Sequence, residues 1–253
     1  KPGMGPNPEV PGHTASGLTR PGKNVAHAMS INDINETIDA YAEDARICEK
    51  IGFDGIEIHG AHGYLIDNFL WEGTNQREDA YGGSIEKRAK FASEIIKAVR
   101  AKVSKDFIVG FRFSQWKQQD YTARLAQDVE ELTSMLKEPI DSGLDYLHSS
   151  MRRYWESEFK ENNNNLAYWT QKISKLPTIS VGSVGLDSDF TDMTAPAEVS
   201  GIEKVIEDIS SSKYDLVAVG RALLADHEWA LKMEEGRLSE IKPYTSNTLK
   251  EFY

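Results

Sequence analysis

The chain has 253 residues, 40% hydrophobic and 27% charged, a composition that suits one large α/β domain and excludes a collagen-like or disordered polymer. Forty acidic and 29 basic side chains give a net charge of −11 without a basic stripe, which argues against a nucleic-acid partner. Because no apolar run is long enough for a membrane span and the first residues resemble no signal peptide, we expect a cytoplasmic protein without a membrane partner. Whether it forms a homo-oligomer is left open.

Residues 1–29 are rich in proline and glycine and show no sustained hydrophobic period. They predict a loop segment that follows an earlier strand. Order begins at Ser30, which forms a capping-box pattern with Asp33 and precedes apolar residues at helical spacing. We therefore expect a helix that ends at Gly52.

The rest of the chain alternates between short apolar strands and helices. Such alternation is typical of parallel strands covered by helices. Strands are expected at residues 55–59, 107–113, 144–149, 178–181 and 216–219, and helices at 84–103, 125–141, 165–175, 197–210 and 226–235.

The pattern favours a TIM (β/α)8 barrel over a doubly wound sheet. No Gly-x-Gly-x-x-Gly follows a strand, and polar residues cluster just after the strand ends. A closed barrel needs eight strands, and about five strand–helix units are legible. We expect residues 1–253 to form one domain whose N-terminal strands lie outside this sequence.

The strongest motif is the end of the first predicted strand, where His59, His62 and Tyr64 follow an apolar run. Two imidazoles can donate hydrogen bonds to one carbonyl or nitro oxygen, and a tyrosine nearby can supply a proton. Alternatively, the two histidines only satisfy backbone groups at the strand end. A zinc site is a further alternative, but no carboxylate or thiol lies at convincing ligand spacing, so we expect no metal.

A long polar loop and a helix cap follow this motif. With the histidines before it and Arg88 after it, the loop resembles the signature of the old yellow enzyme family, whose members carry a similar segment: Asn75-Gln76-Arg77-Glu78-Asp79-Ala80-Tyr81-Gly82-Gly83-Ser84. The resemblance extends from about Lys1 to Lys232 and covers the later part of the family's barrel. Within the loop, we expect Arg77, Asp79 and Tyr81 to hold its shape.

The resemblance implies a function and the roles of several residues. Members of the family bind FMN, take hydride from NADH or NADPH, and reduce activated C=C bonds of enones, nitroalkenes and similar acceptors. His59 and His62 would bind the acceptor's electron-withdrawing group, and Tyr64 would protonate its carbon. Arg112, at the end of an apolar strand, would lie beside the flavin ring, where positive charge favours the reduced form.

Two further strand ends carry glycines that would let backbone N–H groups approach an anion. By resemblance, Gly182, Ser183, Gly220 and Arg221 would bind the FMN phosphate. Tyr154 follows another strand and either helps to line the substrate pocket or packs within its loop.

The sequence leaves two alternatives to an FMN-dependent oxidoreductase open. Another phosphate-binding barrel enzyme, such as an isomerase or aldolase, would use the glycines but leave the histidines and Arg112 unexplained. A non-catalytic barrel fragment could instead serve as an assembly subunit.

Overall fold

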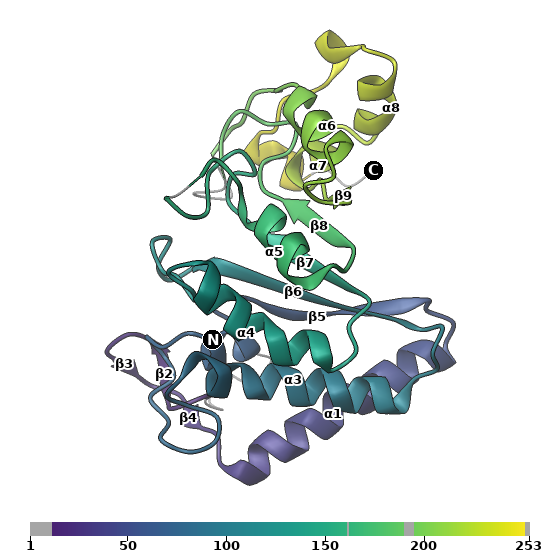
Figure 1. The fold of residues 1–253 in the computed structure, drawn as a ribbon. Helices are drawn as coiled ribbons and strands as arrows, with labels where there is room; N and C mark the ends of the chain where they lie inside the picture. Colours follow the sequence, from purple (N-terminus) through teal and green to yellow (C-terminus); the bar gives the residue numbers. More distant parts are fainter. Residues whose placement is uncertain (1–11, 161, 190–194, 251–253) are drawn as a thin grey trace. The chain divides into compact units, whose positions relative to one another are not determined.

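A computed structural model describes residues 12–160, 162–189 and 195–250. The chain divides into two compact units, and the boundary falls within β7 (Tyr146–Ser150), after His148. The first unit also includes Ile173–Leu176, and the second comprises Ser149–Lys172 and the residues from Pro177 onward. Figure 1 labels most of the helices and strands of both units.

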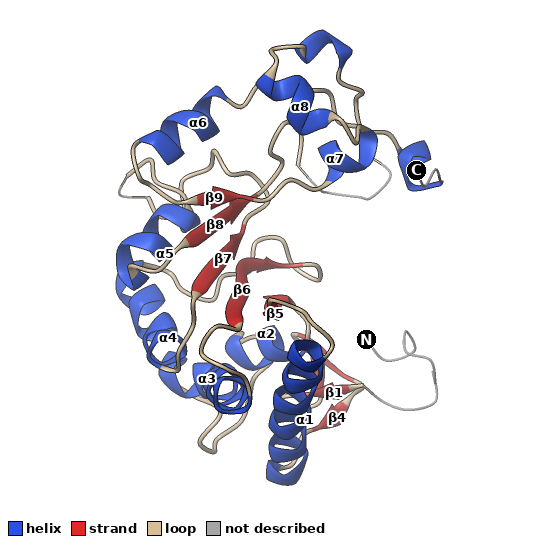
Figure 2. Ribbon diagram, turned by 90° about the vertical axis from the view of Figure 1, so that its right-hand side faces the viewer, coloured by secondary structure: helices blue, strands red, loops and turns tan. Residues whose placement is uncertain are grey.

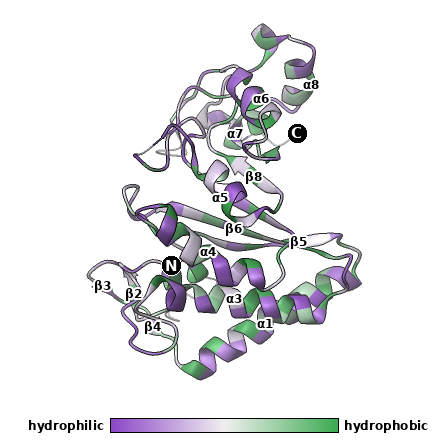
Figure 3. Cartoon of the chain, in the orientation of Figure 1, coloured by the Kyte–Doolittle hydropathy of each residue, from purple (hydrophilic) through white to green (hydrophobic). Residues whose placement is uncertain are grey.

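The first unit is built on two parallel strands, β5 (Gly55–His62) and β6 (Ile108–Lys117). Three helices, α1 (Ile31–Lys50), α3 (Ile85–Lys102) and α4 (Val129–Asp141), pack side by side on one face of these strands (Figure 1, Figure 2). Hydrophobic and hydrophilic segments alternate along α1 and α3 (Figure 3). The residues that α3 buries are Arg88, Ala89, Phe91, Ala92, Ser93, Ile95, Ile96 and Val99.

The capping box predicted at the start of α1 is confirmed. The Ser30 hydroxyl accepts a hydrogen bond from the Asp33 N–H, and the Asp33 carboxylate accepts one from the Ser30 N–H. These bonds satisfy donors that the first turn of a helix leaves without partners.

Several predicted boundaries in this unit are wrong, and one helix was not predicted. Strand β5 continues to His62 although its apolar run stops earlier, because backbone pairing with β6 needs no apolar side chain. Helix α4 begins after the cap Asp128 rather than at residue 125. Helix α2 (Leu65–Leu70) was not predicted, since six residues are too few to show a hydrophobic period.

Part of the segment 1–29, predicted to be a loop, forms short strands in the structure. Its described residues hold two strand pairs, too short to show an alternating pattern: β1 (His13–Thr14) with β4 (His27–Ala28), and β2 (Leu18–Arg20) with β3 (Lys23–Asn24). Residues 1–11 of that prediction lie outside the described residues.

The second unit contains the parallel strands β8 (Thr178–Val181) and β9 (Leu216–Val217). Its helical elements are most of α5 (Leu166–Ser174), α6 (Glu203–Ser210), α7 (Arg221–Ala225), α8 (Trp229–Glu234), η1 (Leu238–Glu240) and η2 (Ser246–Lys250). Helix α6 starts six residues later than predicted, because Ala197 instead forms a backbone bridge with Tyr244. Among the residues that the structure describes, no helix is long and apolar enough to cross a membrane.

Candidate active site

The three residues predicted to act on the acceptor lie together where β5 ends. The His59 ring centroid is 5.3 Å from that of His62 and 5.5 Å from that of Tyr64. A positive φ of 63° at His62, followed by 81° at Gly63, turns the chain after the strand. Tyr64 caps α2 and is 44% exposed. The end of β5 and the turn after it thus present two imidazoles and one accessible phenol within one short segment.

Both imidazoles are neutral near pH 7. Burial, helped by the positive charge of Arg112, lowers the pKa of His62 to about 3. The same two causes lower the pKa of His59. Each neutral ring keeps one N–H donor, so the pair can polarise an acceptor oxygen without carrying charge.

Arg112 lies on β6 directly across from His59 in the strand register. Burial lowers the pKa of its guanidinium, and the charge of Glu57 opposes that shift. Burial also disfavours the ionised form of Glu57, but hydrogen bonds from His148 and Tyr146 and the charge of Arg112 hold its pKa below the ordinary value. A carboxylate therefore balances the cation on this face of the strands.

Several side chains around this turn were not predicted from the sequence. Trp116 stacks on His62 with ring centroids 4.4 Å apart. A pocket of about 210 Å³ lies beside Tyr64 and is lined by Gly12, His13, Thr14, Thr19, Gly63, Tyr64, Leu65, Asn68 and Gln119. The polar residues at the end of β6 could have indicated that this strand end lies near the site, because the carboxyl ends of parallel strands meet at one edge of a sheet. No sequence pattern indicated that residues 12–19 help to line the pocket, because tertiary folding brings them to it.

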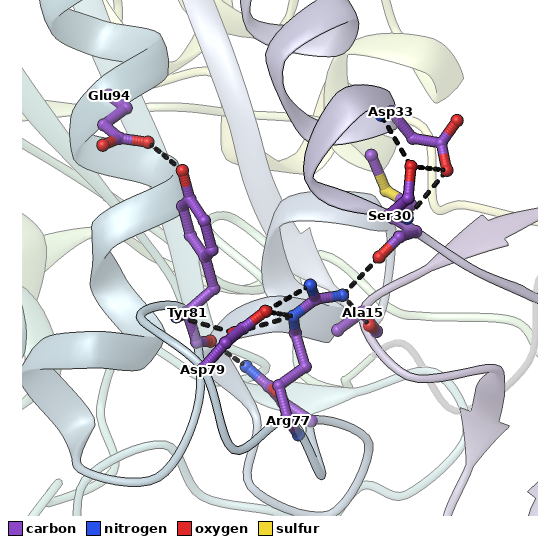
Figure 4. A network of polar contacts seen from close by, with 9 residues as sticks. Ala15, Ser30, Asp33, Arg77, Asp79, Tyr81 and Glu94 are labelled. Atoms are coloured by element: carbon purple, nitrogen blue, oxygen red, sulfur yellow. Dashed lines mark hydrogen bonds and ion pairs between the residues drawn. The ribbon is translucent and has the colours of Figure 1, made fainter.

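The loop after α2 is held by its own side chains, as expected (Figure 4). The Arg77 guanidinium donates to the Asp79 carboxylate at 2.6 Å and to the carbonyl of Ala15 at 2.7 Å. Tyr81 donates its hydroxyl hydrogen to Glu94 at 2.7 Å. These three loop residues therefore fix the shape of the segment that follows the candidate site.

The two predicted phosphate-binding segments come together within the second unit. Arg221 Nη2 donates to the Ser183 hydroxyl over 3.2 Å, and that hydroxyl donates to the carbonyl of Arg152. A Cβ on Gly182 would lie 2.9 Å from a backbone oxygen, so only glycine fits there, whereas a Cβ on Gly220 would enter open space. The segments thus combine hydroxyl, guanidinium and backbone N–H groups, a donor set that suits a phosphate.

Tyr154 is buried in the second unit, with 6% of its surface exposed and its ring against that of Trp155. This burial fits loop packing, and a substrate contact stays a prediction. Among the described residues, no group of three or more His, Cys, Asp or Glu side chains is placed to hold a metal ion.

Comparison with known proteins supports the sequence resemblance. The chain is 36% identical over 222 residues to an NADH oxidase of Thermoanaerobacter brockii, covering 85% of this chain and 31% of that protein. It is 29% identical over 238 residues to a cinnamate reductase of Clostridium sporogenes, covering 86% of this chain and 33% of that protein. The chain therefore spans about a third of each relative's length.

A solved structure shows the fold. The old yellow enzyme homologue from Zymomonas mobilis matches with a TM-score of 0.68 and 24% identity, over 88% of this chain and 61% of that one. Within the described residues, five strands are each followed by a helix, and they are strand–helix units of a TIM barrel, as predicted. The model of the NADH:flavin oxidoreductase / NADH oxidase family matches residues 5–240, and the chain belongs to that family.

Proposed function

We propose that the intact protein is an FMN-dependent oxidoreductase that passes hydride from NADH or NADPH to an activated C=C bond. The acceptor would be an enone, a nitroalkene or a similar molecule. One observation carries this proposal: two neutral imidazoles and an exposed phenol lie together at the end of β5. A relative that is named cinnamate reductase supports an acceptor with a conjugated C=C bond.

His59 and His62 bind the acceptor by its carbonyl or nitro oxygen. Both rings are neutral, so each donates one hydrogen bond to an oxygen on which negative charge grows during the reaction. Such a donor is typically worth about 2.7–4 kcal/mol of barrier. Their role is therefore to stabilise the charge that hydride addition creates.

Tyr64 supplies the proton that completes the reduction. Its ring lies 5.5 Å from that of His59 between centroids, and its exposure lets it reach a bound molecule. General acid catalysis of this kind typically contributes about 10²–10⁴-fold to the rate. The imidazoles would act on the acceptor's oxygen and the phenol on its α-carbon, while the hydride adds to the β-carbon.

The residues present fit FMN. The paired Ser183 and Arg221, with Gly182 and Gly220, form a donor set for its phosphate, and Arg112 supplies the cation for its ring. When bound, FMN supplies the hydride that it takes from the nicotinamide. The chain's own residues hold the cofactor, polarise the acceptor and deliver the proton, and we propose no metal.

The proposal extends to the whole protein. Residues 1–253 would belong to one cytoplasmic FMN-binding barrel domain completed by strands outside this sequence. Its partners would be small molecules, with a homo-oligomer left open.

An absorbance spectrum of the intact protein tests this function. We expect a flavin spectrum that bleaches when NADH or NADPH is added without oxygen and returns when an enone is added. A colourless protein would overturn the proposal. A flavoprotein that reoxidises only with oxygen would overturn the C=C acceptor.

A further inference from the structure

A buried ion pair joins the two chain segments that flank the candidate site. Asp67 and Lys117 lie 2.8 Å apart, and both side chains are 0% exposed. The Lys117 ammonium also donates to the carbonyls of Ser114 at 3.0 Å and Gln115 at 2.8 Å. Asp67 accepts a hydrogen bond of 2.5 Å from the N–H of Gly63. The ion pair thus binds backbone groups of two segments: Gly63 after β5, and Ser114 and Gln115 in β6.

The two residues of the ion pair lie in the elements on either side of the His62–Tyr64 turn. Lys117 is the last residue of β6 and the register partner of His62. Asp67 lies in the first turn of α2, the helix that Tyr64 caps. The ion pair therefore connects the start of α2 to the end of β6, on either side of the segment that carries His62 and Tyr64.

His62 is fixed to β6 by its backbone as well. Its N–H donates to the Ser114 hydroxyl at 2.9 Å, and its carbonyl accepts from the N–H of Gln118 at 3.4 Å. The Ser114 hydroxyl in turn donates to the carbonyl of Trp116 at 2.7 Å. The positive φ of His62 is therefore supported from both sides, as an uncommon backbone conformation requires.

Stability alone is a weak reason for this pair. Removing two charges from water costs several kcal/mol, and well-packed apolar residues in their place are often as stable or more so. Burial opposes both charges, raising the pKa of Asp67 to about 6 and lowering that of Lys117. What apolar residues could not supply is the directed set of bonds to Gly63, Ser114 and Gln115.

We propose that Asp67 and Lys117 are positioning residues, which hold the His62–Tyr64 turn so that the phenol is aimed at the acceptor bound by the histidines. The inference rests on the proposed function, because it takes Tyr64 to be the proton donor. Neither residue touches the acceptor. They act on it only through the turn.

The test compares Asp67→Asn, Lys117→Met and the double variant D67N/K117M in the intact protein. Each single variant leaves a buried group without its partner and is expected to lower the melting temperature. The double variant removes both charges and is expected to regain most of that loss. Asp226 and Lys232, a second buried pair at 2.7 Å, provide the matched control double D226N/K232M.

The first measurement is amide hydrogen exchange, which needs no flavin. We expect exchange across residues 60–66 to be faster in D67N/K117M than in the parent by about tenfold, while α3 keeps the parent rate. The control double should leave residues 60–66 unchanged. This arm decides whether the pair holds the turn even if the protein proves not to bind flavin.

The second measurement is the ratio of flavin reoxidation rates with an enone and with a nitroalkene. A nitronate can leave before it is protonated, so only the enone rate depends on an aimed phenol. We expect the double variant to lose on the order of tenfold in the enone rate and little in the nitroalkene rate, within the range that general acid catalysis contributes.

Several outcomes would overturn the proposal. Parental exchange and a parental ratio in a double variant of recovered stability would make the pair a stability device only. Equal loss with both acceptors would mean that the pocket, and not the aim of Tyr64, had changed. A double variant that does not fold while the control double does would also reduce the pair to a stability role.

Discussion

Glu57 on β5 accepts a 2.8 Å hydrogen bond from His148 on β7 by reaching across β6. The residue of β6 opposite Glu57 is Gly110, which has no side chain to block the way. The Tyr146 ring covers that glycine, and its hydroxyl donates to the same carboxylate oxygen at 3.1 Å. Because Glu57 also faces the charge of Arg112, the glycine helps to set the electrostatics of the candidate site.

The first prediction concerns this glycine. A Cβ on Gly110 would lie 2.0 Å from the Tyr146 ring, so Gly110→Ala should force the ring away and destabilise the fold by about 1–3 kcal/mol. Urea unfolding would measure the loss. In a Tyr146→Ala background the same substitution should cost much less, since the ring is gone. Equal costs in both backgrounds would show that the contact is not the cause.

The second prediction concerns the acceptor. His59→Ala and His62→Ala should each weaken binding of a phenol ligand and slow enone turnover by about 2.7–4 kcal/mol of barrier. Flavin content should stay near the parent value, because neither ring is assigned to the cofactor. Equilibrium titration and steady-state rates would measure both effects. Variants that keep their turnover but lose a bound metal would restore the zinc alternative.

The third prediction concerns pH. The pKa of His62 is about 3 in the folded chain and 6.5 without its surroundings, so between these values the unfolded chain binds a proton that the folded chain does not. The stability that depends on neutral His62 is therefore complete above pH 6.5 and is lost progressively as the pH falls toward 3. The free energy of unfolding of the parent, relative to His62→Asn, should decline over that range.

An imidazole NMR titration checks the same assignment directly. The His62 signals, identified by their absence from His62→Asn, should not titrate between pH 5 and 8. A midpoint near 6.5 would contradict the neutral ring on which acceptor polarisation depends.

The fourth prediction separates the two halves of the catalytic cycle. Tyr64→Phe keeps the ring but removes the proton, so flavin reduction by NADH or NADPH should stay within a few-fold of the parent. Enone reduction should fall by roughly 10²–10⁴-fold. Reoxidation by a nitroalkene should survive. Stopped-flow traces of each half-reaction would measure the three rates, and equal losses with both acceptors would mean that Tyr64 shapes the pocket and is not the acid.

The sequence was sufficient to predict the order and the type of the long helices and strands. Ser30 and Asp33 marked the start of α1, and β8 was predicted to the residue, because caps and apolar periods are local properties. The grouping of His59, His62 and Tyr64 was also legible, since all three lie within six residues. Local spacing therefore determined the family resemblance and the core of the candidate site.

Only the tertiary structure revealed the residues that support the site. Asp67 meets Lys117 fifty positions later, and Glu57 meets His148 ninety-one positions later. No hydrophobic period or short motif encodes such pairs, because parallel strands bring together residues that are separated by a whole helix. The charges at the site and the support of its turn depend on these long-range contacts, which form only when the strands pair.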